Sequence, residues 1–196
     1  MAGGDADKIV LQYPYGRRKK VSKNMNEKVI YENYNSSALG KFSEKWPREA
    51  SRGVVYFSDG DILIFLKEKI GQYKLPGGGK ENNEKPEETF IREVHEETGY
   101  RVKNLQKVGI TNEYTQISHI FLAEPDGDAD DFHPDEAEIS QGAKCLKMNP
   151  KDALSKMREF IDKYEGKNDD ESLIRYYITL RDYKILEYIC NKLLKN

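Results

Sequence analysis

The sequence contains little cysteine, few apolar residues and almost no net charge. Its two cysteines, Cys145 and Cys190, are too few and too far apart for the disulfide framework of a small secreted domain, so we expect reduced core residues. The apolar runs are too short for a membrane span or a signal peptide, which predicts a cytoplasmic protein without membrane contact. A formal net charge of −2 provides no overall field towards nucleic acid, so nucleic acid is a less favoured partner without being excluded.

The apolar fraction is also low and predicts a modest core. It is 37%, against a usual value of about 45–50%, while charged residues reach 34%. A chain of 196 residues therefore suits one domain with polar appendages. We expect a partly flexible N-terminal extension over 1–47, a domain over 48–165 and a C-terminal helical extension over 166–196 that packs on the domain.

Short apolar runs separated by turn residues predict an α/β fold. The turn at 58–60, Ser-Asp-Gly, separates two runs rich in valine and isoleucine and suits a hairpin. The expected strands cover residues 51–57, 61–68, 72–75, 100–110, 117–124 and 142–148. A helix is expected to begin at Pro150 and to end near Ile161.

A second helix is expected close to the C-terminus. Thr179 and Asp182 have the spacing of a capping box, T-x-x-D, which predicts that the helix begins between them. The residues that this helix would bury at helical spacing are Ile185, Leu186, Ile189 and Leu193. Docking on the sheet or on a partner subunit is the role that we favour, and a base pocket lined by Tyr176, Tyr177 and Arg181 is the alternative.

Residues 86–98 predict a short helix with one apolar stripe. Pro86 suits its first position, where a missing N–H removes no hydrogen bond. Phe90, Ile91 and Val94 recur at helical spacing and would pack on a core. Gly99 is suited to the left-handed residue that ends a helix.

The same helix carries three glutamates on one side. Glu93, Glu96 and Glu97 stand at i, i+3 and i+4, where like charges repel, and the last two lie at the negative end of the helix dipole. A solvated acidic face is the ordinary explanation of such a run, but lysines usually interleave there, and only Arg92 and His95 intervene. A divalent cation such as Mg2+ would reverse both unfavourable terms, so we interpret the face as a metal site.

This stretch resembles a complete Nudix box, G-x5-E-x7-R-E-U-x-E-E-x-G-U, in which U is a bulky apolar residue. Gly78 is followed after five residues by Glu84, and after seven more by REVHEETGY over 92–100, which includes Gly99. The resemblance implies an α/β/α sandwich with a mixed β-sheet, to which this chain adds the N-terminal extension and the C-terminal helix. It also implies a structural role for Gly78, Glu84 and Gly99.

The resemblance implies a set of metal ligands. The carboxylates of Glu93, Glu96 and Glu97 and the backbone carbonyl of Gly77 would hold Mg2+ or Mn2+. Glu97, at the centre of the acidic face, would be the ligand common to every metal. The metals would bridge phosphate oxygens and acidify a bound water.

The resemblance also implies which groups support the reaction. Glu93 is the candidate general base within the box, and Glu136 and Glu138, in an acidic loop further along the chain, are its rivals. Arg92 would orient Glu93 or Glu96, and Glu84 would pair with Arg92 and fix the loop.

The expected reaction is hydrolysis of a pyrophosphate bond in a nucleoside diphosphate linked to another group, with a small-molecule nucleotide as substrate and a homodimer as a possible assembly. The substrate classes left open are nucleotide sugars, ADP-ribose, dinucleoside polyphosphates and nucleoside triphosphates. One alternative is action on RNA 5′ ends, suggested by the basic cluster at 17–20. Another is a nucleotide-binding module without catalysis. Arg48 and Arg52 precede the first strand of the domain and could reach substrate, but we favour their interpretation as solvated surface residues.

Overall fold

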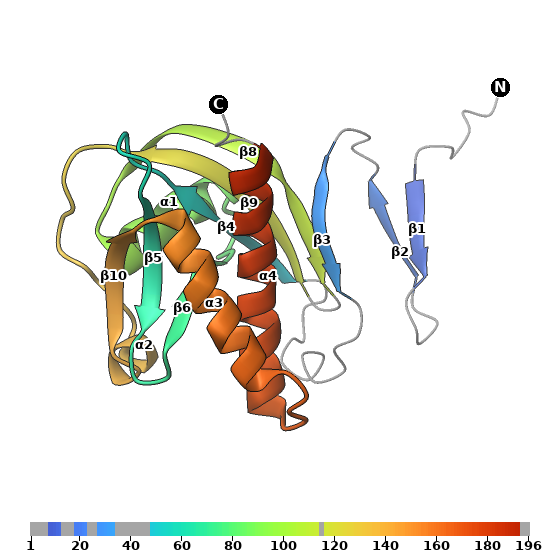
Figure 1. Ribbon diagram of the computed structural model, residues 1–196. Helices are drawn as coiled ribbons and strands as arrows, with labels where there is room; N and C mark the ends of the chain where they lie inside the picture. Colours follow the sequence, from blue (N-terminus) through green and yellow to red (C-terminus); the bar gives the residue numbers. More distant parts are fainter. Residues whose placement is uncertain (1–7, 13–17, 23–26, 34–47, 114–115, 193–196) are drawn as a thin grey trace.

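A computed structural model describes residues 8–12, 18–22, 27–33, 48–113 and 116–192 (Figure 1). The predicted core residue Leu193 and part of the basic cluster at 17–20 lie outside these ranges. The strands are β1 Lys8–Gln12, β2 Arg18–Ser22, β3 Val29–Asn33, β4 Arg48–Val55, β5 Ile62–Lys67, β6 Gln72–Lys74, β7 Gly77–Gly79, β8 Val102–Glu113, β9 Gln116–Pro125 and β10 Ala143–Met148. The helices are α1 Pro86–Thr98, α2 Glu136–Ser140, α3 Pro150–Tyr164 and α4 Asp170–Lys192.

The strands form a mixed sheet and two antiparallel sheets. The mixed sheet has five strands in the order β3-β8-β9-β4-β7, in which β3 runs parallel to β8 and β4 runs parallel to β9. The second sheet has the order β10-β5-β6, and β1 pairs with β2 in the third. The predicted α/β class with a mixed sheet is thus confirmed.

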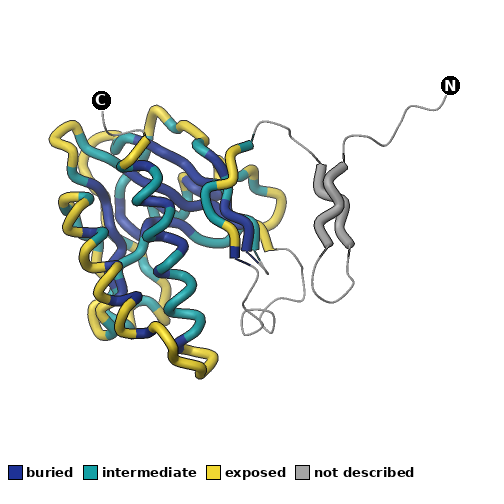
Figure 2. Tube along the Cα trace, turned by 45° about the vertical axis from the view of Figure 1, so that its right-hand side comes forward, coloured by how far each residue is buried: buried dark blue, intermediate teal, exposed yellow. Residues whose placement is uncertain are grey.

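Side chains alternate between the two faces of the strands, and a layer of helix packs on each face. One face of β4, β5 and β9 packs with α3 and α4, through a cluster that includes Val54, Ile64, Ile120, Met157 and Ile185. The opposite face packs with α1, through Val55, Leu63, Phe90, Val94 and Phe121. Because successive strand residues point to opposite faces, Val54 and Val55 belong to different layers. Figure 2 shows the buried strands between exposed helix faces, which confirms the predicted α/β/α sandwich.

The turn at 58–60 forms, but the two strands that it joins enter different sheets. The amide of Phe57 donates to the carbonyl of Asp61 at 2.8 Å, and the amide of Gly60 donates to Phe57 at 2.9 Å. Beyond a single bridge between Tyr56 and Ile62, β4 joins the five-stranded sheet and β5 joins the three-stranded sheet. The expected hairpin is therefore restricted to its turn, because β4 pairs with β9 and β7, whereas β5 pairs with β10 and β6.

This separation of strands positions the glycine turn. β6 pairs with β5, whereas β7 pairs with β4, so the chain crosses from one sheet to the other at Leu75 and Pro76. The amide of Gly53 donates to the carbonyl of Pro76 at 3.2 Å and fixes the crossing. Residues 77–79 consequently lie against α1, the helix that follows them in the chain.

The C-terminal helix begins earlier than the capping-box pattern predicts. α4 is continuous from Asp170, where the side chain of Asp169 accepts a hydrogen bond from the amide of Ser172 at 2.9 Å. Thr179 lies in the middle of the helix and donates to the carbonyl of Arg175 at 2.9 Å, while Asp182 is buried. The prediction of a helix start at Thr179 was wrong, because tertiary contacts use both side chains. Among the helices that the structure describes, none combines the length and hydrophobicity that a membrane crossing requires.

Candidate active site

α1 holds the acidic face between the sheet and the glycine turn. Phe90 and Val94 are fully buried against the sheet, and Gly99 ends the helix with a left-handed φ of 74°. Ile91 was expected in the same apolar stripe but is 43% exposed, because it lies about 100° around the helix from Phe90. Glu97, one turn beyond Val94, is buried.

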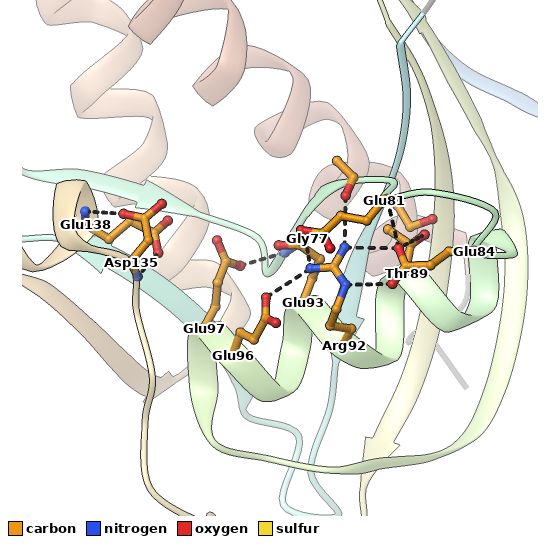
Figure 3. Close-up of polar contacts among 12 residues, drawn as sticks. Gly77, Glu81, Glu84, Thr89, Arg92, Glu93, Glu96, Glu97, Asp135 and Glu138 are labelled. Carbon is orange, nitrogen blue, oxygen red and sulfur yellow. Dashed lines mark hydrogen bonds and ion pairs between the residues drawn. The ribbon is translucent and has the colours of Figure 1, made fainter.

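Arg92 connects the loop, the glycine turn and two of the acids (Figure 3). Its Nε donates to Glu84 at 2.7 Å, and its Nη2 donates to Glu84 at 3.1 Å and to the carbonyl of Gly79 at 3.0 Å. Its Nη1 donates to Glu93 at 2.9 Å and to Glu96 at 3.0 Å. Hydrogen bonding to Arg92 lowers the pKa of Glu84 to about 2, so Glu84 is ionised at neutral pH.

Glu97 is the most deeply buried of the three acids. Its Oε2 accepts a hydrogen bond from the amide of Gly77 at 2.7 Å, and its Oε1 lies 3.6 Å from Nζ of Lys74. Burial raises the pKa of Glu97 to about 7, against the opposing effect of Lys74 and the Gly77 amide. Burial also raises the pKa of Glu93, and Arg92 opposes this shift.

The glycine turn leaves no room for side chains. A Cβ on Gly78 would lie 2.3 Å from a carboxylate oxygen of Glu93, and one on Gly77 would lie 2.3 Å from the carbonyl oxygen of Ser51. Gly77 also has a φ of 136°, which an L side chain rarely adopts. The turn therefore brings backbone groups directly against the carboxylates of Glu93 and Glu97.

These groups open into a cavity of about 470 Å³. The glycine turn contributes residues 77–79 to its lining, and α1 contributes Glu93 and Glu97. Four cationic side chains and three further carboxylates also line it: Arg48, Arg52, Lys74, Arg181, Glu113, Asp135 and Glu138. Gln116, Ile174 and Ile178 complete the wall. The cavity thus places carboxylates, cations and an apolar patch around one space.

Comparison with known proteins identifies the family. The profile of the NUDIX domain matches residues 47–165, well over half of the chain. The chain belongs to the Nudix hydrolase family. The Nudix box at 78–100 therefore contributes two of the five acids of the cavity, Glu93 and Glu97.

Individual relatives resemble shorter parts of this Nudix chain. A MutT-like protein from Streptomyces ambofaciens is 38% identical over 77 residues, which are 38% of this chain and 50% of that protein. An ADP-ribose pyrophosphatase from Bacillus subtilis (strain 168) is 47% identical over 57 residues, 26% of this chain and 30% of that protein. The chain thus spans half or less of the length of these curated relatives. A solved structure of MutT, from work on Aliivibrio salmonicida and Vibrio cholerae, has a TM-score of 0.44 at 21% identity, covering 55% of this chain and 83% of the other.

The structure brings together only part of the predicted metal set. Glu93 and Glu97 line the cavity, whereas Glu96 turns to Arg92, has a side chain that is 47% exposed, and does not line it. Within the described ranges, no group of three or more His, Cys, Asp or Glu side chains is arranged to hold a metal ion. Gly77 lines the cavity too, and the backbone group by which it contacts Glu97 is its amide N–H, while its predicted role as a carbonyl ligand stays a prediction. The two carboxylates still fit Mg2+, which is commonly held by one or two carboxylates, waters and substrate phosphates.

The acidic loop supplies one of the two predicted rival bases. Glu138 lines the cavity, whereas Glu136 is exposed and does not line it. Asp135, which the sequence did not single out, also lines the cavity and caps α2 by accepting from the amide of Glu138 at 2.7 Å. The carboxylate of Glu138 accepts in return from the amide of Asp135 at 3.3 Å. In Figure 3 both residues lie on the side of Glu97 away from Arg92.

Two arginines of the cavity differ from expectation. Arg52 was interpreted as a solvated surface residue, but it is 5% exposed and pairs with Asp182 at 3.2 Å. Arg181 was considered as part of a base pocket with Tyr176 and Tyr177, but in the described structure it lines the cavity beside two isoleucines instead. The sequence did indicate that Asp182 would be buried and would need a cationic partner. Asp182 stands three residues before Ile185, in the core-facing stripe of the helix.

Proposed function

We propose that the protein hydrolyses a pyrophosphate bond in a nucleoside diphosphate linked to another group, with Mg2+ or Mn2+ as cofactor. The observation that carries this proposal is a pair of carboxylates, the partly buried Glu93 and the buried Glu97, that face the cavity beside the glycine turn. The cavity lining has four cationic side chains and five carboxylates, a formal charge of −1. A polyanionic pyrophosphate would be repelled by the carboxylates unless divalent cations enter with it.

Glu93 and Glu97 would hold the metal beside the glycine turn at 77–79, with the carbonyl of Gly77 as a further proposed ligand. Bound there, Mg2+ or Mn2+ would neutralise phosphate oxygens and lower the pKa of a bound water. Arg92 would keep Glu93 in place, because its guanidinium is itself anchored by two hydrogen bonds to Glu84. The cationic side chains that line the cavity would pair with phosphate oxygens that the metals leave exposed.

Two groups remain candidates for the general base. Glu138 lines the cavity, and its two hydrogen bonds with Asp135 hold the start of α2. Glu93 lines the cavity too, but its carboxylate accepts a hydrogen bond from Arg92 and would also hold the metal, so it is already engaged. Glu138 is therefore the base that we favour, and Glu136 has no place in the proposed reaction.

The site residues say less about the substrate class than about the reaction. Nucleotide sugars, ADP-ribose, dinucleoside polyphosphates and nucleoside triphosphates all carry the linkage. ADP-ribose comes first for testing, because one relative is an ADP-ribose pyrophosphatase. Capped and triphosphorylated RNA belong in the same panel, so that action on RNA 5′ ends is tested alongside.

The test compares wild type with Glu97→Gln and, as a matched control, Glu159→Gln on the exposed side of α3. Chromatography of the panel with Mg2+, with Mn2+ and with EDTA should reveal metal-dependent release of a nucleoside monophosphate. Loss of a direct metal ligand should lower kcat/KM by at least about a hundredfold, beyond the 10–100-fold typical of a supporting residue. The control should retain wild-type activity.

Full turnover by Glu97→Gln would contradict the proposed metal site. Binding of a panel nucleotide without any turnover would instead favour the alternative of a nucleotide-binding module. Hydrolysis that survives EDTA would contradict the cofactor.

A further inference from the structure

One wall of the cavity comes from a helix outside the part of the chain that matches the family. The match ends at residue 165, whereas Ile174, Ile178 and Arg181 belong to α4. Their spacing of four and three residues places them on one side of the helix, along two turns. α4 thus contributes both an apolar strip and a cation to the cavity.

A buried network fixes the cationic end of this wall. Asp182 accepts hydrogen bonds from Nη1 of Arg52 at 3.2 and 3.4 Å and from Nε of Arg181 at 2.9 Å. It also accepts from the amide of Leu75 at 3.1 Å, just before the glycine turn. Nη1 of Arg181 donates to Glu113 at 3.2 Å. All four charged residues are at most 5% exposed, so their positions are held by one another.

Arg52, which lines the cavity, retains an unused donor. Its Nε is buried and has no hydrogen-bond partner among the described residues, although the residue is only 5% exposed and lines the cavity. An unpaired buried donor is unfavourable, and a ligand oxygen that reaches it would remove the penalty. Guanidinium groups bind the oxygens of phosphate with matched planar geometry, so a phosphate is the ligand that suits this position.

We propose that Arg52 and Arg181 form a phosphate-binding subsite on the α4 side of the cavity, with Ile174 and Ile178 against the apolar part of the substrate next to that phosphate. Asp182 is a positioning residue that keeps both guanidinium groups in place. As far as the substrate is concerned, this inference rests on the proposed function. It assigns to α4 a part in selecting the substrate.

The experiment measures phosphate binding without requiring hydrolysis. The probe is methylenediphosphonate, a pyrophosphate analogue that is not hydrolysed, titrated calorimetrically in Mg2+ buffer into wild type, Arg52→Lys and Arg181→Lys. Lysine keeps the charge but loses the planar fork, and losing one charge-assisted hydrogen bond should weaken binding by at least about tenfold. Arg101→Lys is the matched control, because Arg101 is exposed and pairs with Asp130, and it does not line the cavity.

A titration with Mn2+ separates this inference from the proposed metal site, since both lysine variants should bind Mn2+ as wild type does. Unchanged affinity for the probe in both variants overturns the subsite, as does a wild type that does not bind the probe. If circular dichroism shows that the lysine variants do not fold, Ile178→Trp replaces them. Ile178 is partly exposed, and the indole would fill the space beside Arg181 without removing an ion pair. It should reduce the affinity by a similar factor, and wild-type affinity would again overturn the subsite.

Discussion

At the scale of single residues, Arg92 organises much of the acidic face. Its guanidinium makes hydrogen bonds to Glu84, Glu93, Glu96 and the carbonyl of Gly79. These contacts offset the repulsion that the sequence pattern predicts between neighbouring glutamates. They also leave Glu97, which Arg92 does not contact, to face the cavity beside Gly77 and Lys74.

Glu84→Gln tests how far this arrangement depends on its anchor. The amide oxygen could still accept from Arg92 but without the charge, and the difference of about 1 kcal/mol between a charge-assisted and a neutral hydrogen bond corresponds to a fall in Tm of roughly 2–4 °C in a chain of this size. Calorimetric unfolding at pH 7 measures it, with Glu159→Gln as an exposed control. An unchanged Tm would contradict the anchoring role.

The contribution of the Glu84–Arg92 pair to folding stability should depend on pH. Because Arg92 lowers the pKa of Glu84 from 4.5 to about 2, the folded state binds fewer protons than the unfolded state between these values. The contribution to stability is complete above pH 4.5 and is lost as the pH falls through about 2. The difference in unfolding free energy between wild type and Glu84→Gln should therefore shrink along a series from pH 6 to pH 2. A constant difference would show that charge is not its cause.

At the scale of elements, the glycine turn and α1 depend on each other. Their contact requires that residue 78 lack a side chain, because a Cβ there would overlap the Glu93 carboxylate at 2.3 Å. The turn itself is held by pairing with β4 on its other side. The path of the turn therefore sets where Glu93 and Glu97 point.

Gly78→Ala is expected to displace Glu93 and to reduce activity much more than stability. The carboxylate can rotate away from the methyl group, but it then leaves the cavity, and misplacement of a catalytic group by about 1 Å lowers rates by on the order of a hundredfold. Steady-state kinetics on the substrate found in the panel, together with Tm, give the two readouts. Lys80→Ala is the control, because Lys80 follows the turn and pairs with Glu49 at the surface. Wild-type kcat/KM in Gly78→Ala would contradict this account.

Element boundaries were more predictable than element partners. The turn at 58–60 and the helix from Pro86 to the left-handed Gly99 follow from local residues, and the structure has both. The division of β4 and β5 between two sheets depends on strands distant in the chain, which local turn chemistry does not determine. The capping-box pattern at Thr179 failed for the same reason, because Thr179 accepts a hydrogen bond from Gln72 at 3.0 Å.

At the scale of the whole molecule, α4 is part of the core. Ile185, Leu186 and Ile189 are fully buried in the cluster that also contains residues of β4, β5 and β9. Asp182 adds the ion pair with Arg52. A chain without this helix would expose apolar side chains and leave the buried guanidinium of Arg52 without its counter-charge.

Truncation after Glu165 should therefore prevent cooperative folding, even though residues 47–165 match the family. We expect loss of near-ultraviolet circular dichroism and binding of a hydrophobic dye, the behaviour of a compact state without fixed packing. The matched comparison is truncation after Lys192, which keeps all of α4 and should unfold cooperatively. A cooperative transition in the shorter chain would show that α4 is an accessory element.

The sequence alone determined the Nudix box, the acidic face of α1, the α/β class and most strand positions, because each depends on residues close together in the chain. Tertiary structure decided which of those residues meet. It placed Glu93 and Glu97 at the cavity, left Glu96 with Arg92, and buried Arg52 beside Asp182. A buried ion pair joins positions 130 residues apart, and local patterns cannot show whether a charge finds such a partner or stays in water.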